Sequence, residues 1–309
     1  MSFVVSSLNN YTNEQSTDLL VKALFGSKTA STLQSAGQVQ VGVKSSATLN
    51  LLNSTVFFQA DGCGYNPSGS TTFTQRTITV GAVKVEETLC PKTLEAKWMQ
   101  TQIMAGSPTM IPFEEQVGAE KSAVIAENIE IAMWQGDTTS GNPNLNRFDG
   151  FNKIIAAASP TLANSAPTAF TSITVSNIDD ILDQVYANIP ARIATKSDLV
   201  CFIGVDAFKL MLVNLKNANL FHYAVDASQT MEMVYPGTNM KLIGVGGLSG
   251  TNKIVAGSLS NFFVGTDLAN EEEVYKLWYS EDNDEVRFRT TFAYGVQVAY
   301  PAEVVFFTL

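Results

Sequence analysis

The 309-residue chain is 45% apolar, which is ample for a core, yet only 16% of its residues are charged, below the roughly 25% of ordinary soluble domains. Its net charge is −10 and it contains no run of Lys or Arg, which argues against tight or sequence-specific nucleic-acid binding, because phosphate contacts need clustered cations. A surface rich in Ser, Thr, Asn, Gln and Ala suits a protein whose faces meet other protein faces, although secreted adhesins share this composition.

Cysteine spacing and the N-terminal sequence give no sign of export or of a metal site. Cys63, Cys90 and Cys201 are odd in number and form no CxxC pair, so we expect three reduced thiols rather than a zinc site or a disulfide framework. The N-terminus has neither a basic region nor a continuous apolar region, and no apolar stretch approaches the ~20 residues that span a bilayer. We therefore expect no signal peptide and no membrane contact.

The first 90 residues predict an arm followed by a protrusion. Residues 1–36 are polar with one short helical pattern that Gly26 closes, which is typical of an arm that packs against neighbours. GQVQVGV (37–43) and TITVGAVKV (77–85) alternate with period two around the loop DGCGYNPSGSTT. They predict a long two-stranded protrusion, which is marginal alone and implies a partner surface. The alternative is a hairpin folded back onto its own domain.

The clearest helix is predicted at about 112–135. Pro112 suits the first helical position, Glu114 and Glu115 favour the positive end of the helix dipole, and Gly136 ends the helix. At 1.5 Å per residue such a helix is roughly 36 Å long, which is enough for the spine of a domain.

Residues 137–172 have the composition of a loop, and mixed elements follow. Ser176 is expected to cap a helix that Pro190 ends, and Asp206 to cap another. Buried or half-buried strands are expected at 199–204, 241–247, 253–258 and 261–266. After the strand EVYKLWYS and the turn EDND, apolar residues occupy even positions from Val286 to Tyr300, which predicts a strand far longer than usual. EVVFFTL gives a last strand, so the fold class is α+β.

Catalytic motifs are not found in this sequence. His222 is the one histidine, no GxSxG elbow supplies a serine, and GVGGLSG misses the dinucleotide fingerprint because a strand rather than a helix follows. The loop around Asp282 lacks the ligand pattern of a calcium-binding loop. Adjacent carboxylates, such as Asp179 with Asp180, do not face each other on a helix. We expect no enzyme activity, no catalytic or metal-binding residue and no cofactor.

The order of elements resembles the capsid fold of tailed bacteriophages (Hong Kong 97 type), and the resemblance covers essentially the whole chain. The stretch VRFRTTFAYGVQVAYPAEVVFFTL carries the family's Arg-containing strand and Pro-Ala ending, at Arg287, Arg289, Pro301, Ala302, Val304 and Val305. GDTTSGNPNLNRFDGF is similar to the family's link after the spine helix, although Phe151 stands where a smaller residue is commoner.

The resemblance implies four parts. These are an N-terminal arm (1–36), an E-loop β-hairpin (37–90), a P-domain (91–150 and 267–309, with the spine helix at about 112–135 and the long C-terminal strands) and an A-domain (151–266).

In function, the resemblance implies a major capsid protein whose hexamers and pentamers form an icosahedral shell around double-stranded DNA. Its partners would be itself, a portal protein, a separate scaffolding protein and cement or decoration proteins. Its location would be the virion, after assembly in the cytoplasm of the host bacterium. Two alternatives stay open: an encapsulin-like nanocompartment shell protein, and a surface adhesin or tail-associated β protein.

Overall fold

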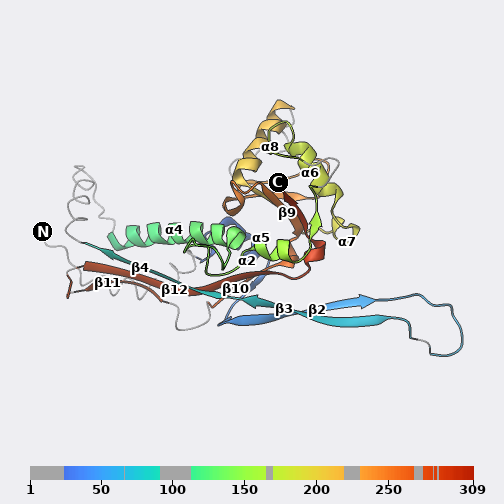
Figure 1. Ribbon diagram of the computed structural model, residues 1–309, viewed down its shortest axis with the longest axis horizontal. Coiled ribbons are helices and arrows are strands. Elements are labelled where there is room, and N and C mark those ends of the chain that lie inside the picture. Colours follow the sequence, from blue (N-terminus) through green and yellow to red (C-terminus); the bar gives the residue numbers. More distant parts are fainter. Residues whose placement is uncertain are drawn as a thin grey trace.

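The computed structural model shows an elongated body from which one hairpin projects, with a second body above it (Figure 1). The residues that the structure describes are 24–65, 67–90, 113–164, 170–218, 230–267, 274–280, 282–283 and 285–309.

The elongated body is a five-stranded sheet built around one long strand, β12 (Glu285–Val298). β12 pairs antiparallel with β4 (Gly81–Leu89), β11 (Val274–Ser280) and β10 (Phe262–Thr266). The short β1 (Val39–Gln40) adds to β10 in parallel. Even-numbered residues of β12 from Val286 to Val298 are buried, as the predicted alternation requires.

Helix α4 (Phe113–Gln135) lies along this sheet (Figure 1) and is about 35 Å long. Ile129, Met133 and Trp134 are buried against the sheet and its neighbours. The helices α2 (Lys28–Ser35) and α5 (Phe151–Ala157) lie beside its C-terminal half. The predicted spine helix and its end at Gly136 are therefore confirmed.

The second body is a six-stranded sheet in the order β5-β13-β9-β6-β8-β7. Its strands are β5 (Thr161–Leu162), β13 (Val305–Thr308), β9 (Lys253–Ser258), β6 (Leu199–Gly204), β8 (Lys241–Val245) and β7 (Glu232–Val234). Every residue of β6 is buried, because both faces of the sheet are covered. Cys201 and Ile203 face one core, with α6 (Ile178–Ala187) and α8 (Val205–Asn217), while Val200 and Phe202 face α4. The short α7 (Ala191–Ala194) follows α6.

Strands β2 (Ser46–Thr55) and β3 (Ser70–Thr79) form the hairpin, with ten paired positions. Its two strands project beyond the body, at the end opposite to β11 (Figure 1). At about 3.3 Å per residue, the paired part alone is about 33 Å long. The prediction that the hairpin protrudes rather than folds back is confirmed, but the strands that form it differ from those expected.

Two strand assignments in this region were wrong. GQVQVGV supplies only β1, which pairs with β10 and is not part of the hairpin. TITVGAVKV is divided at Gly81, so that its first part ends β3 and its second part is β4 of the long sheet. A Cβ on Gly81 would lie 1.9 Å from the Arg147 carbonyl oxygen, so the bend between the two strands needs a glycine.

Two predicted helix caps were wrong as well. Helix α6 starts after Asn177, whose side chain accepts the Thr174 amide proton, and Ser176 does not cap it. β6 leads directly into α8, so Gly204 occupies the cap position. Asp206 lies in the first turn, and its carboxylate accepts the Gly250 amide proton at 3.0 Å. The stretch expected to be loop contains α5 and β5, while the arm before residue 24 lies outside the described residues.

Candidate assembly surfaces

The root of the hairpin is fixed firmly to the long sheet. Ile78 is fully buried, and a Cβ on Gly265 of β10 would lie 2.8 Å from it, so the two strands approach closely because Gly265 has no side chain. The Gln297 side-chain amide donates to the Thr77 carbonyl at 2.7 Å, and the Tyr300 hydroxyl donates to the Leu52 carbonyl at 3.4 Å. The body therefore sets the direction in which the hairpin points.

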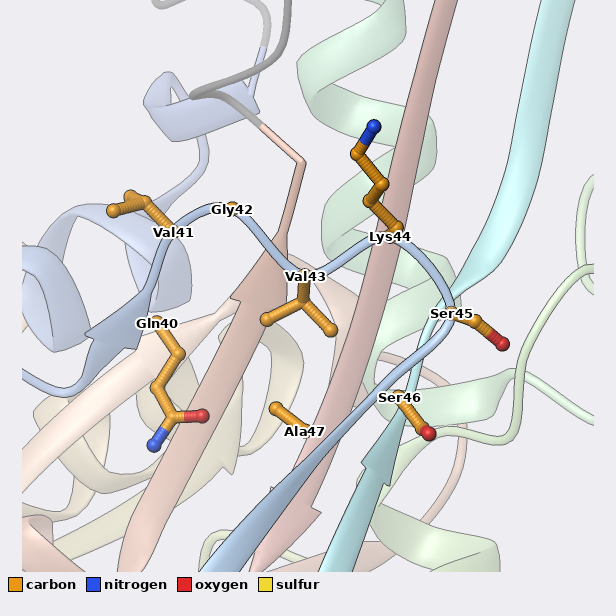
Figure 2. A pocket seen from close by; sticks show the side chains of 8 residues that line it. All are labelled: Gln40, Val41, Gly42, Val43, Lys44, Ser45, Ser46 and Ala47. Atoms are coloured by element: carbon orange, nitrogen blue, oxygen red, sulfur yellow. The ribbon is translucent and has the colours of Figure 1, made fainter.

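Residues 40–47 lead from β1 into the hairpin and line an open hollow beside the sheet (Figure 2). Gly42 has a φ of 77°, a conformation that favours glycine. The next residue, Val43, is buried, and its amide donates to the Thr266 carbonyl at 3.1 Å. Val41 is 61% exposed and points away from the strands (Figure 2). Residues 40–47 thus hold the hairpin root through Val43 and leave Val41 open to solvent.

Beyond its root the hairpin exposes large apolar side chains. Phe58 is fully exposed, Tyr65 is 93% exposed and Val56 is 77% exposed at the tip. On the strands, Leu52 and Phe73 are direct cross-strand partners, 52% and 79% exposed. Exposed apolar groups of this size, gathered on one protruding element, mark a protein interaction site. An isolated two-stranded sheet cannot bury them itself.

The Leu52–Phe73 pair lies on the hairpin face that points away from the body. The buried root residues Leu49 and Ile78 have the opposite parity in the ladder and so lie on the other face. Two hydrogen-bonded polar pairs flank Leu52 and Phe73. The Gln75 side-chain amide donates to the Asn50 side-chain oxygen at 3.0 Å, and the Ser54 and Thr71 hydroxyl oxygens lie 3.0 Å apart. An apolar centre within a polar rim is the usual composition of a protein–protein contact.

A second feature of the surface is a groove between β4 and α4, whose apolar lining is mostly buried. Val83, Val85 and Phe292 from the sheet, Val124 and Ile129 from the helix and Phe148 line it. Glu87 and Lys121 form an ion pair at its rim, where Arg147 also lies, exposed to solvent. This groove lies beside the spine helix, on the other side of the hairpin root from the tip (Figure 1).

A buried polar network holds α2 against α4 near this groove. The Glu130 carboxylate, 6% exposed, accepts the Thr29 amide proton at 3.0 Å and the Thr29 hydroxyl proton at 2.6 Å. The Trp134 indole donates to the same hydroxyl at 2.9 Å. Since Thr29 is in the first turn of α2, a carboxylate there also favours the helix dipole. Sequence reasoning missed this network, because its members lie about a hundred residues apart.

An ionic cluster organises the loop after α4. The Lys153 ammonium donates to Asp137 and Asp149, at 2.7 Å each. The hydrogen bond from Lys153, together with the Thr139 hydroxyl and amide, holds the pKa of Asp137 well below its ordinary value. For Asp149, burial opposes the shift, but bonds from Lys153 and Thr138 still lower the pKa. Both carboxylates are thus structural ligands of Lys153 rather than parts of a catalytic pair.

The residues that were candidates for catalysis, metal binding or nucleotide binding lie apart from one another in the described part of the chain. Cys63 and Cys90 are exposed, whereas Cys201 is buried and burial raises the pKa of its thiol. GVGGLSG contains the last two residues of β8 and the short 3-10 helix η3 (Gly246–Leu248), which packs against α4. His222 lies outside the described residues. Within the part of the chain that the structure describes, no helix is long and apolar enough to cross a bilayer, and no three metal-ligating side chains form a group.

Comparison with known proteins gives the fold. No protein-family model matches the sequence, and no curated protein does. Among solved structures, the chain is similar to one from the procapsid of satellite phage P4 that includes size determination (Sid) protein. The TM-score is 0.60 at 12% identity, covering 95% of this chain and 90% of that chain.

Two further solved structures agree. The chain matches one from Gordonia phage Cozz with a TM-score of 0.57 at 13% identity, covering 90% of this chain and 85% of that one. It matches one from the capsid of Myoviridae phage XM1 with a TM-score of 0.54 at 12% identity, covering 88% of this chain and 90% of that one. Identity this low establishes the fold alone. The chain has the fold of phage capsid subunits, and the predicted α+β fold class is confirmed.

Proposed function

We propose that the chain is the major capsid protein of a tailed bacteriophage, a structural subunit that assembles as hexamers and pentamers into an icosahedral shell around double-stranded DNA. The observation that carries this proposal is the hairpin of a phage-capsid fold, which exposes its apolar side chains far from its own body. Many modest contacts of this kind stabilise a closed assembly, because each one raises the effective concentration of the next.

The four parts named for this fold are proposed with changed boundaries. The hairpin corresponds to 46–79 rather than 37–90, because Gly81–Leu89 belongs to the long sheet with α4 and β12. β10 (Phe262–Thr266) likewise belongs to the P-domain with the long sheet, and β13 (Val305–Thr308) belongs to the A-domain with the six-stranded sheet. A net charge of −10 suits a wall that encloses DNA without binding it tightly.

The remaining partners are part of the same proposal. A portal protein, a separate scaffolding protein and cement or decoration proteins would complete the particle, which would assemble in the cytoplasm of the host bacterium. The subunit itself contributes contacts and no catalysis. An encapsulin-like nanocompartment would use the same kind of shell, and the contents of purified shells, DNA or enzyme, distinguish the two.

Removal of the hairpin tests the proposal. The Val80 amide donates to the Ser45 carbonyl at 3.0 Å, so a two-residue turn can join these residues in place of 46–79. A deletion that extended to residue 85 would instead remove half of β4. We expect the shortened chain to keep its helix content in circular dichroism, to lose only the strand content of β2 and β3, and to form no shells in electron microscopy.

Point variants give the matched comparison. Phe58→Ser at the hairpin tip should reduce assembly, whereas Val213→Ser, an exposed apolar position on α8, should not. Shells of normal yield and size from the chain without its hairpin would refute the proposed role of the hairpin.

A further inference from the structure

Lys28 lies where a helix does not favour a cation. It is the first residue of α2, directly after Ser27, whose side chain caps the helix by accepting the Ala30 amide proton at 3.4 Å. The N-terminal end of a helix dipole is positive, so a lysine at this position opposes the dipole. The Lys28 ammonium forms an ion pair with Glu232 of β7. Glu232, and not α2 itself, therefore accounts for a lysine at this position.

This ion pair joins the two bodies of the subunit. α2 belongs to the elongated body, because the Glu130 carboxylate of α4 accepts the amide and hydroxyl protons of Thr29, and Leu33 is fully buried in the core beside α4 and β10. Glu232 belongs to the six-stranded sheet, in its last strand. Two consecutive residues of α2 thus bind one carboxylate from each body. We call these two contacts, Lys28 with Glu232 and Thr29 with Glu130, the α2 bridge.

The Glu232 carboxylate is held by two lysines. Burial opposes its ionisation, but hydrogen bonds from Lys241 of β8 and from Lys28 still lower the pKa of Glu232 below its ordinary value. The side chains of Lys28 and Glu232 are 34% and 23% exposed, so solvent screens the pair only in part. Lys241 lies in the same sheet as Glu232. Of the two lysines, only Lys28 connects the carboxylate with the other body.

A contact nearer the middle of the six-stranded sheet is apolar. The Phe202 ring on β6 lies 5.1 Å from the Trp134 ring of α4 and 5.5 Å from the Phe262 ring of β10. Apolar contact is non-directional, so it holds the bodies together but specifies their relative angle less sharply than an ion pair at the sheet edge. β7 is two strands away from β6, which gives a lever arm of about 10 Å. A rotation of about 10° around β6 would move Glu232 by about 2 Å, which is enough to separate it from Lys28.

We propose that the α2 bridge fixes the angle between the two bodies of the subunit by tying the outer edge of the six-stranded sheet to α2. Without Lys28 the sheet can rotate about the Phe202 contact. The consequence of this inference rests on the proposed shell function. The angle between the bodies contributes to the curvature at which subunits meet, so a fixed angle favours shells of one size.

Spin labels on the unassembled subunit measure the angle directly. In a Cys63→Ser, Cys90→Ser background, labels are attached at Ala123→Cys on α4 and at Val213→Cys on α8. Both positions are exposed, and Cys201 is buried and stays unlabelled. The distance between the two labels then reports the relative position of the two bodies.

Lys28→Met should broaden the distribution of this distance by about 3 Å, the arc of a rotation of about 10° at about 15 Å from β6. Lys241→Met is the matched control, because it removes a lysine from the same carboxylate within one body, and it should leave the distribution unchanged. Lys28→Arg keeps the charge and should also leave it unchanged. Lys28 is partly exposed at a helix end where a neutral residue is favourable, so Lys28→Met should fold, which circular dichroism checks.

Electron microscopy of assembled particles tests the consequence. Lys28→Met should give a broader range of shell diameters than the original chain, and Lys241→Met should not. Shells of one unchanged diameter from Lys28→Met, despite a broadened label distance, would show that the bridge does not control curvature.

The outcomes separate the two proposals. If neither Lys28→Met nor Lys241→Met broadens the label distance, or both do so equally, the α2 bridge does not fix the angle and the ion pair is an ordinary surface contact, while the shell function stands. If the original chain forms no assembly under any condition, the shell function fails, and the label distances still decide whether the bridge fixes the angle.

Discussion

Gly247 lies where the turn after β8 approaches α4. A Cβ at this position would lie 2.3 Å from the Glu130 carbonyl oxygen and 2.5 Å from the Trp134 ring. At the preceding residue, Gly246, the nearest atom to such a Cβ is Glu130 Cγ at 3.7 Å, an ordinary contact. Gly247→Ala and Gly246→Ala therefore add the same methyl group to one turn, but only the first should lower the stability strongly.

The cost at Gly247 follows from the movement that it demands. The clash with the Glu130 carbonyl must open by about 1 Å, and the atoms involved are helix backbone and a buried indole, which cannot rotate away. Overpacking of this kind costs about 1–3 kcal/mol, and we expect about 3 kcal/mol because the shift also strains the Glu130–Thr29–Trp134 network. Gly246→Ala should change stability by less than about 1 kcal/mol.

Urea denaturation of the unassembled subunit, followed by tryptophan fluorescence and circular dichroism together, measures both values. Agreement of the two probes is needed for a two-state free energy. Equal destabilisation by Gly247→Ala and Gly246→Ala would refute the reasoning. It would mean that the turn can move away from α4 at little cost.

The other predictions concern the network, the loop and the hairpin root. Glu130→Gln should lower the free energy of unfolding by about 2 kcal/mol, because an amide has one acceptor oxygen where the buried carboxylate has two. An unchanged free energy of unfolding in urea denaturation would contradict this. Lys153→Met should be destabilising by a constant amount from about pH 5 to 9, where both carboxylates and the ammonium are charged. Because the folded pKa values of Asp137 and Asp149 are lowered, that difference should shrink as pH falls below about 3.9 in pH-dependent melting curves. A difference that grows on acidification would contradict the assignment. Gly295→Ala would place a Cβ 2.2 Å from a carbonyl oxygen of β3 and should detach the hairpin root, seen as faster amide hydrogen exchange there; unchanged exchange would argue against this contact.

The elements that could be predicted from sequence are those whose pattern reflects burial within one subunit. α4 has a clear end at Gly136, β6 and β9 match the predicted bounds, and β12 alternates because one face is buried along its whole length. Each of these elements meets its burial partner inside the chain, so its periodicity is a direct consequence of its packing.

The hairpin strand β2 could not be found in this way. Its residues SATLNLLNST are exposed on both faces near the tip, so selection for one apolar face is absent and no alternation appears. The break within TITVGAVKV was visible in principle. Apolar residues occupy even positions at Ile78 and Val80 and odd positions at Val83 and Val85, and the change of parity marks the bend at Gly81.

The candidate assembly surfaces were predicted only in part. A protruding hairpin was expected, but its apolar cluster at Val56, Phe57 and Phe58 was not singled out, although three large apolar residues before a Gly-rich loop are a usable signal. The β4–α4 groove could not be predicted, because it combines residues from 83 to 292 that only the fold brings together.

The measurement that tests the central claim most directly is electron microscopy of the purified chain at rising concentration, alone and with a candidate scaffolding protein, beside size-exclusion chromatography. We expect closed shells tens of nanometres across, or rings of five and six subunits, in at least one of these conditions. A folded chain that remains a 33.3 kDa monomer in both conditions would contradict this expectation.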